Sequence, residues 1–156
     1  MLAEEVGAML RERSETLAVA ESCTGGGLGD MITDIAGSSD YFLGGIVSYS
    51  NRAKVDILGV SEEVLKLEGA VSEKVAIQMA EGVKNRFGSA YGIGITGIAG
   101  PTGATQNKPV GLVFIAVSSR SGSICRENHF SGSRTEVKDQ AAIAALDLLR
   151  SVLCRA

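Results

Sequence analysis

Three side chains that can act as nucleophiles follow one another in the segment Glu21-Ser22-Cys23-Thr24-Gly25-Gly26. The segment follows an apolar, β-branched stretch at 16–20 and precedes apolar residues at helical spacing, which predicts a glycine turn between a strand and a helix. Backbone N–H groups in such a turn can stabilise an oxyanion or a bound anion. The same residues also fit a structural turn in which Thr24 caps the helix and Cys23 is a small buried apolar residue. The pattern leaves both interpretations open.

A second candidate group, Tyr49 and Lys54, lies where a predicted strand at 41–50 is followed by a predicted short helix at 51–58. A lysine that its surroundings partly desolvate loses its proton more readily and can act as a base. An exposed lysine on a short surface helix is the alternative interpretation.

The third candidate group is the turn Thr96–Pro101, which follows a predicted strand at 90–95. Its glycines, Gly97 and Gly100, would let the backbone approach a ligand closely, and they would equally suit a loop that needs positive φ. Because sites in open α/β folds lie beyond the ends of strands, we expect the three turns to meet at one edge of the sheet.

Two other arrangements of potentially functional residues are weaker. Gly92, Gly94 and Gly97 match a dinucleotide-binding fingerprint, but the first two fall inside the predicted strand and Pro101 follows where a helix should begin. His129 is the only histidine, so a structural role is favoured for it over a serine–histidine triad. If a serine is the nucleophile, its base is therefore expected to be a lysine or a tyrosine.

The elements that must position these turns alternate between helices and strands. Helices are also predicted at 2–13, from Leu28 to Gly37, after Ser61, after Ser72 and from Ser133 onward. Further strands at 110–118 and 124–130 predict a hairpin through Ser121-Gly122-Ser123. This order predicts an α/β fold, a three-layer α/β/α sandwich with a mixed, mostly parallel sheet of about five strands. The length of 156 residues fits a single domain over 1–156.

The composition argues against several classes of function. With 15 Lys and Arg against 18 Asp and Glu, the formal net charge is −3, and only 4% of the residues are aromatic. No nucleic-acid partner is therefore expected. No apolar run reaches the roughly 18 to 20 residues that span a bilayer, and the first residues lack a signal-peptide pattern. Cys23, Cys125 and Cys154 have neither disulfide-framework nor metal-ligand spacing, which favours a cytoplasmic protein without a metal site.

Five blocks of sequence together cover nearly the whole chain. They are AESCTGG at 20–26, AGSSDYFLGGIVSYSNRAK at 36–54, GAVSEKVAIQMAEG at 69–82, TGIAGPTG at 96–103 and KPVGLVFIA at 108–116. In this order they resemble the CinA C-terminal family. The resemblance implies an anticodon-binding-domain-like α/β/α sandwich. It also implies a nicotinamide-nucleotide amidohydrolase, which converts nicotinamide mononucleotide to nicotinate mononucleotide and ammonia without a metal or an organic cofactor.

The resemblance also implies roles for individual residues. Ser22 matches the family's proposed nucleophile and Lys54 its proposed base, while Tyr49, Thr96 and Arg134 match residues that assist. We expect Ser22 to attack the carboxamide while a neutral Lys54 takes up its proton. Backbone groups of the 23–26 or 96–100 turn would hold the oxyanion or the phosphate, and the Arg134 guanidinium is a candidate for the phosphate. The expected substrate-binding residues are Cys23, Thr24, Gly25, Gly26, Gly97, Gly100 and Arg134.

The chain departs from the family pattern at two places. Gly103-Ala104-Thr105 stands where relatives often read GPxGGT, and Leu112 stands where threonine is common. Because these changes would alter loop shape or substrate preference, a pyridine-nucleotide-binding domain without turnover is the alternative function. Cys23 as the nucleophile is a third hypothesis. Many relatives carry an additional N-terminal domain, whereas here we expect a stand-alone domain. We expect it to assemble as a homodimer or larger homo-oligomer.

Overall fold

Five strands form one sheet in the order β2-β1-β3-β4-β5 in the computed structural model, which describes residues 1–156. The strands are β1 (Leu17–Glu21), β2 (Phe42–Val47), β3 (Tyr91–Gly97), β4 (Leu112–Ser119) and β5 (Gly122–His129). β1 pairs in parallel with β2 and β3, whereas β4 pairs antiparallel with β3 and β5. The predicted mixed sheet is confirmed, and only β4 runs opposite to the other four strands. The segment 98–111 returns β4 directly beside β3, and β5 follows β4 through a tight hairpin.

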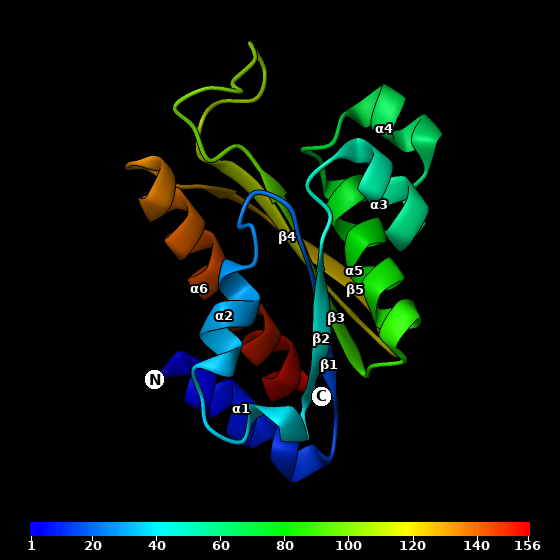
Figure 1. Cartoon of the computed structure of the whole chain (residues 1–156), viewed down its shortest axis with the longest axis vertical. Coiled ribbons are helices and arrows are strands. Elements are labelled where there is room, and N and C mark those ends of the chain that lie inside the picture. The colour runs from blue at the N-terminus through cyan, green and yellow to red at the C-terminus, as the bar shows by residue number, and fades with distance from the viewer.

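Helices cover both faces of the sheet, as the three-layer prediction requires (Figure 1). On one face lie α1 (Leu2–Arg13), α2 (Gly27–Thr33) and α6 (Arg134–Arg155). On the other face lie α3 (Asn51–Leu58), α4 (Glu62–Glu68) and α5 (Glu73–Phe87), and a single turn, η1 (Ser38–Asp40), precedes β2. None of these helices combines the length and the apolar character needed to cross a membrane.

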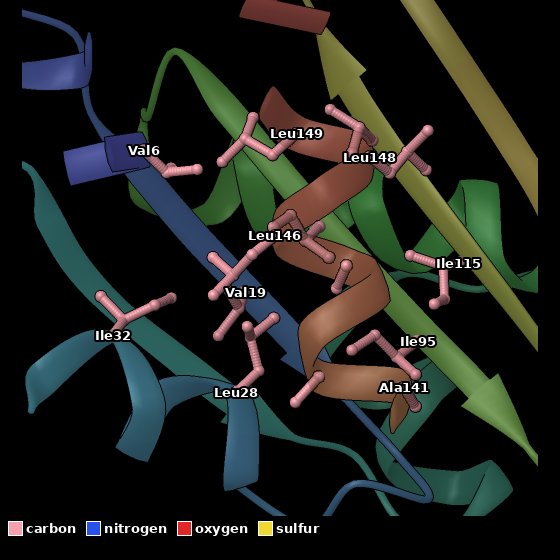
Figure 2. Close-up of a cluster of buried hydrophobic side chains, with 14 of the residues drawn as sticks. Val6, Val19, Leu28, Ile32, Ile95, Ile115, Ala141, Leu146, Leu148 and Leu149 are labelled. Atoms are coloured by element: carbon pink, nitrogen blue, oxygen red, sulfur yellow. The ribbon is translucent and has the colours of Figure 1, made fainter. Parts of the chain in front are cut away.

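The larger core fills the space between the sheet and the layer of α1, α2 and α6. It holds 24 buried residues, and Figure 2 shows Val19 on β1, Leu28 on α2 and Leu146 on α6 within it. Side chains alternate across a strand, so Val19 faces this core whereas Ala18 and Ala20 face α5. Burial of each large aliphatic side chain contributes about 1.5–3 kcal/mol. The core therefore anchors β1 and, with it, the turn that follows.

Two glycines set the distance between α5 and the sheet. A Cβ atom at Gly94 would lie 2.3 Å from the Ala76 carbonyl oxygen, and one at Gly92 would lie 2.2 Å from the Ala80 carbonyl oxygen. Only glycine lets the two backbones approach so closely. These glycines of the apparent dinucleotide fingerprint therefore serve helix–sheet packing, as their position inside a predicted strand indicated.

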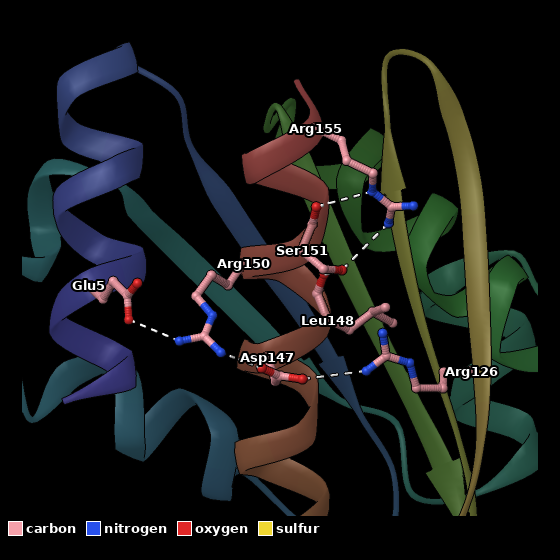
Figure 3. Close-up of polar contacts among 7 residues, drawn as sticks. All are labelled: Glu5, Arg126, Asp147, Leu148, Arg150, Ser151 and Arg155. Atoms are coloured by element: carbon pink, nitrogen blue, oxygen red, sulfur yellow. Dashed lines mark hydrogen bonds and ion pairs between the residues drawn. The ribbon is translucent and has the colours of Figure 1, made fainter.

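Ion pairs tie α6 to the elements beside it. Arg150 contacts Glu5 on α1 at 3.0 Å and Asp147 at 2.7 Å. Asp147 also lies 3.4 Å from Arg126 on β5 (Figure 3). Because these pairs are partly exposed, each contributes at most about 1 kcal/mol. Their main effect is to fix how α6 lies against its neighbours.

Most helices and strands lie close to their predicted bounds. The helices at 2–13 and 51–58 and the capping box at Ser133 are confirmed. The strand predicted at 41–50 ends at Val47, because the chain must turn before the next helix begins. The helix predicted from Leu28 to Gly37 ends at Thr33, and a turn leads from it into η1.

Candidate active site

Ser22 and Lys54 are in direct contact at the edge of the sheet. Ser22 follows the last residue of β1, and Lys54 lies near the start of α3, whose N-cap residue Ser50 accepts a hydrogen bond from the Ala53 N–H at 3.0 Å. The distance between Lys54 Nζ and Ser22 Oγ is 2.9 Å. Both residues are buried, with 1% of Lys54 and 8% of Ser22 exposed. The structure thus brings together residues from two of the three predicted turns.

The surroundings of Lys54 favour its neutral amine form over the protonated ammonium form. Its Nζ lies 2.8 Å from the Ser48 carbonyl oxygen and 3.2 Å from the Tyr49 carbonyl oxygen. No carboxylate lies within ion-pair distance of it. Burial therefore lowers the pKa of Lys54 from its usual value of 10.5.

A neutral Lys54 would be oriented by these contacts. A neutral amine has two N–H groups and one lone pair. When the carbonyls of Ser48 and Tyr49 accept the two N–H groups, the lone pair is left for the Ser22 hydroxyl. In this arrangement Lys54 can accept a proton from Ser22.

Thr96, Tyr49 and Arg134 complete the polar part of the site. The Thr96 hydroxyl donates a hydrogen bond to the Ala70 carbonyl oxygen at 2.8 Å. Arg134, the first residue of α6, donates to the Gly100 carbonyl oxygen at 2.8 Å and to the Tyr49 hydroxyl at 3.1 Å. Arg134 thereby joins the turn after β3 to the segment after β2.

These residues line one cavity with a volume of about 310 Å³. That volume is at the lower end of the range for small-molecule sites. The walls of the cavity come from the segments that follow β1 and β2, the end of β3 and the segment after it, the connection between α4 and α5, and the start of α6. The three predicted turns therefore meet at one edge of the sheet, beneath the loop that extends from the top of the molecule in Figure 1.

Cys23 lines the cavity, but its thiol is poorly suited to nucleophilic attack. Burial, with a smaller contribution from the negative charge of Glu21, raises the pKa of Cys23 to about 11. The thiolate is the reactive form of cysteine, so Cys23 is protonated at neutral pH. Its backbone N–H has no acceptor among the other residues, and neither has that of Ala99, which also lines the cavity.

Three of the predicted binding residues, Thr24, Gly25 and Gly26, do not line the Ser22 cavity. They line a separate cavity of about 400 Å³ on the side of α2 and α6. The N-cap of α2 is Gly26, so the structure also corrects the interpretation of Thr24 as the cap. The cause is the tight turn after Ser22, which directs these residues away from the Ser22 cavity.

The Glu21 carboxylate accepts the hydrogen bonds of backbone N–H groups at the start of α2, in place of the side chain of a capping residue. It accepts hydrogen bonds from the backbone N–H groups of Leu28 and Gly29, each at 2.9 Å. Glu21 is almost fully buried. A protein carboxylate therefore already occupies the position at which the glycine turn was expected to hold an anion.

The remaining predicted residues divide between the cavity and its surroundings. Gly97 lines the cavity, whereas Gly100, with a φ of 82°, presents its carbonyl to Arg134 and is not part of the lining. His129 lies on β5, where its ring contacts Glu127 at 2.7 Å, outside the cavity.

Sequence reasoning missed part of the cavity wall. The missed residues are Asn51, Ala70, Val71, Thr102 and Gly103. The polar amide of Asn51, which lies within the Tyr49–Lys54 motif, could have indicated its place in the cavity wall, whereas Ala70 and Val71 carry no chemical signal. Ser48 was also missed, because it acts through a backbone carbonyl, which no residue type encodes.

The chain is similar to one group of proteins along nearly its whole length. The sequence profile of the CinA C-terminal domain matches residues 1–153. A CinA-like protein of Thermosynechococcus vestitus is 56% identical over 155 residues, which cover 97% of this chain and 37% of that protein. A putative competence-damage inducible protein of Moorella thermoacetica is 55% identical over 143 residues, which cover 92% of this chain and 34% of that protein. The chain thus spans about a third of the length of these relatives.

Solved structures share the fold closely. A competence/damage inducible protein from Agrobacterium tumefaciens is 39% identical, with a TM-score of 0.94 over 96% of this chain and 92% of that one. A competence-damaged protein (CinA) superfamily member from Klebsiella pneumoniae is 32% identical, with a TM-score of 0.96 over 99% of this chain and 97% of that one. The similarity includes every segment that forms the Ser22 cavity.

Proposed function

The chain belongs to the CinA C-terminal domain family, and from that premise we propose that it hydrolyses the carboxamide of nicotinamide mononucleotide. The products are nicotinate mononucleotide and ammonia. The observation that carries the proposal is the 2.9 Å contact between Ser22 Oγ and the Nζ of the buried Lys54. A hydroxyl beside a lysine that releases its proton readily is a nucleophile paired with its base.

In the first half of the reaction, Ser22 becomes acylated. Lys54 takes the proton of the Ser22 hydroxyl as Oγ attacks the carboxamide carbon, which gives a tetrahedral intermediate with a negatively charged oxygen. Lys54 then returns the proton to the nitrogen, the C–N bond breaks, and ammonia leaves. The product of this half is a nicotinoyl ester on Ser22.

In the second half, water hydrolyses the ester on Ser22. Lys54 accepts a proton from the water as its oxygen attacks the ester carbon, and a second tetrahedral intermediate forms. The ester bond to Ser22 breaks, Lys54 returns the proton to Oγ, and the carboxylic acid leaves and loses its proton to water to give the carboxylate product. The enzyme is then in its starting state.

Two backbone N–H groups can take up the charge of both intermediates. Those of Cys23 and Ala99 have no acceptor among the other residues, and both residues line the cavity. Donors fixed in advance in a buried site stabilise an oxyanion without reorganising during the reaction. Cys23 directly follows the nucleophile, which suits its N–H to this task.

Arg134 suits the phosphate of the nucleotide. Its guanidinium has five N–H donors, and the contacts to Gly100 and Tyr49 leave three of them unused. Arginine binds phosphate oxygens in a bidentate geometry. Thr96 uses its hydroxyl hydrogen on Ala70, so it can face a substrate only as an acceptor, which matches an amide N–H.

A second candidate function is binding of the nucleotide without turnover. The observation behind it is that Gly103, the first residue of the segment that departs from the family pattern, lines the cavity together with its neighbour Thr102. A changed loop would then hold the carboxamide away from Ser22. This function predicts saturable binding without release of ammonia.

Ammonia release by the purified chain tests the proposal. Nicotinamide mononucleotide is supplied to the wild type, to Ser22→Ala and to Ser118→Ala, a buried serine outside the cavity that serves as the matched control. We expect release by the wild type and Ser118→Ala and almost none by Ser22→Ala. Turnover retained in Ser22→Ala rejects Ser22 as the nucleophile, and a wild type that binds the nucleotide without releasing ammonia supports the binding function.

A further inference from the structure

A hollow of about 570 Å³ lies at the end of the sheet away from Ser22. Tyr91 at the start of β3 lines it, whereas Gly97 at the end of β3 lines the Ser22 cavity. At about 3.3 Å per residue, the two places are roughly 20 Å apart. Its lining comes from the β4–β5 turn and from the C-terminal parts of α5 and α6, which lie toward the lower end of the molecule in Figure 1. It therefore belongs to no part of the site described above.

Three cations from three different elements line this hollow. They are Lys84 on α5, Arg120 in the β4–β5 turn and Arg155 at the end of α6. None of them is within ion-pair distance of a carboxylate. Of the seven other arginines, five have such a partner, whereas Arg86 and Arg134 do not; the five are Arg11, Arg13, Arg52, Arg126 and Arg150.

The positive charge of the hollow is only partly compensated inside the protein: Ala156, which carries the C-terminal carboxylate, also lines the hollow, but this carboxylate forms no ion pair with any of the three cations. Glu15 is the only acidic side chain in its lining, and it is engaged with the Tyr91 hydroxyl at 3.0 Å and Arg13 at 3.9 Å. Three unpaired cations facing one hollow repel one another, and this protein has a net charge of −3, with acids in excess. An anion in the hollow would relieve that repulsion.

Local contacts account for two of the cations but not for the third. Lys84 and Arg155 lie in the last turns of their helices, where a positive charge interacts favourably with the helix end. Arg155 also donates to the carbonyl and hydroxyl oxygens of Ser151 (Figure 3). Arg120 is exposed in a tight turn and makes no hydrogen bond from its side chain. A ligand would provide its partner.

We propose that this hollow binds a phosphate-chain anion, either free pyrophosphate or the polyphosphate of a nucleotide. Cations that converge from three elements match the several charged oxygens of such a chain, whereas a single carboxylate would occupy only one of them. The hydroxyls of Ser119 and Ser121 lie beside Arg120 and can rotate to donate further hydrogen bonds. The volume of about 570 Å³ is also sufficient for a small ligand.

Calorimetric titration of the whole chain with pyrophosphate at low salt tests this site. The variants are Lys84→Ala, Arg120→Ala and Arg155→Ala, and the matched control is Arg86→Ala, which removes the same charge from the same end of α5 but does not line the hollow. We expect saturable binding that each of the three variants weakens about tenfold or more and that Arg86→Ala weakens less than about twofold. Melting temperatures without ligand check that the variants are folded.

Three outcomes would overturn the proposal. The first is the absence of saturable pyrophosphate binding by the wild type. The second is an equal loss of pyrophosphate affinity in Arg86→Ala and Arg120→Ala, which would indicate attraction by the overall electrostatic field of the protein alone. The third is a loss of pyrophosphate affinity in Arg134→Ala but not in Arg120→Ala, which would place the anion in the Ser22 cavity. None of these readouts uses turnover, so they are independent of the proposed hydrolysis.

Adenosine, ATP and tripolyphosphate distinguish the sources of the anion. Equal binding of ATP and tripolyphosphate supports recognition of the phosphate chain alone. Tighter binding of ATP supports a nucleotide as the ligand. Binding of adenosine as tightly as ATP contradicts phosphate recognition.

Discussion

Ser22 Oγ lies 2.9 Å from Lys54 Nζ, although 32 positions separate the two residues in the sequence. The contact follows from the parallel pairing of β1 and β2. The Ser48 N–H donates to the Glu21 carbonyl oxygen at 2.8 Å, just beyond the strand ladder, so the chain leaves both strands side by side. Ser22 follows directly after one strand, and α3 brings Lys54 back from the other.

Lys54→Arg is expected to lose turnover although it keeps the positive charge. A guanidinium does not release its proton in proteins, so it cannot take the proton of Ser22. We expect kcat to fall by about 10²- to 10⁴-fold in Lys54→Arg and in Lys54→Met. Steady-state ammonia release measures this, with Lys66→Arg on α4 as the control. Full activity in Lys54→Arg would mean that another group is the base.

The pH dependence of the reaction should report the pKa of Lys54. The base works in its neutral form, so kcat/KM is expected to rise with pH as Lys54 loses its proton. Because burial lowers this pKa from 10.5, the rise should be centred below pH 10.5. Initial rates between pH 6 and 10, at subsaturating substrate, give the midpoint.

Folding stability provides an independent check on the same pKa. Between the lowered pKa of folded Lys54 and the ordinary 10.5 of the unfolded chain, the unfolded state binds more protons, so the free energy of unfolding rises with pH. Below that window the folded protein bears the cost of a buried charge. Urea unfolding at several pH values should therefore show wild type gaining stability relative to Lys54→Met as pH rises. A constant difference would contradict a lowered pKa.

Arg134→Lys is expected to impair hydrolysis of nicotinamide mononucleotide more than hydrolysis of the riboside. Lysine keeps the charge but loses the bidentate geometry that suits phosphate. We expect KM for nicotinamide mononucleotide to rise about tenfold or more, while turnover of the riboside, which lacks the phosphate, changes little. Tyr49→Phe, which removes only the contact to Arg134, should have a smaller effect. Equal losses on both substrates would assign Arg134 a purely structural role.

Gly94→Ala is expected to destabilise the fold strongly. Its Cβ would lie 2.3 Å from the Ala76 carbonyl oxygen, so α5 must move away from β3. Such overpacking costs about 1–3 kcal/mol or more in the free energy of unfolding. Gly27→Ala is the matched control, because nothing lies within 4 Å of its Cβ and its φ is not positive. Its stability should stay within about 0.5 kcal/mol of the wild type in the same urea titration.

Thiol alkylation is expected to leave the activity intact. Cys154 is exposed, whereas Cys23 is buried and burial raises its pKa to about 11. Iodoacetamide at pH 7 should therefore label Cys154 first. Mass spectrometry of the labelled peptides, combined with the rate of ammonia release, checks this. Inactivation in parallel with labelling of Cys23 would support the Cys23 thiol as the nucleophile.

The sequence pattern was sufficient to predict that the turns bearing Ser22 and Lys54 meet, because the positions of polar turns after apolar strands are set locally, whereas the pairing of these two residues was implied by the family resemblance. It did not predict that Thr24 to Gly26 would face another cavity, since the outcome depends on the Glu21 carboxylate reaching forward to α2. The sequence also did not predict the direction of β4 relative to β3. A long segment such as 98–111 can return a strand in either orientation, and only the packing of the finished sheet decides between them.

The cavity wall combines two kinds of support. Ser22 and Lys54 are held by paired strands and a capped helix, whereas Thr102 and Gly103 belong to an exposed loop that makes few contacts with the rest of the chain. Loops of this kind accept insertions and substitutions more readily than strands do. On the proposed function, changes in this loop can therefore alter which amides the cavity accepts while the Ser22–Lys54 pair stays unchanged.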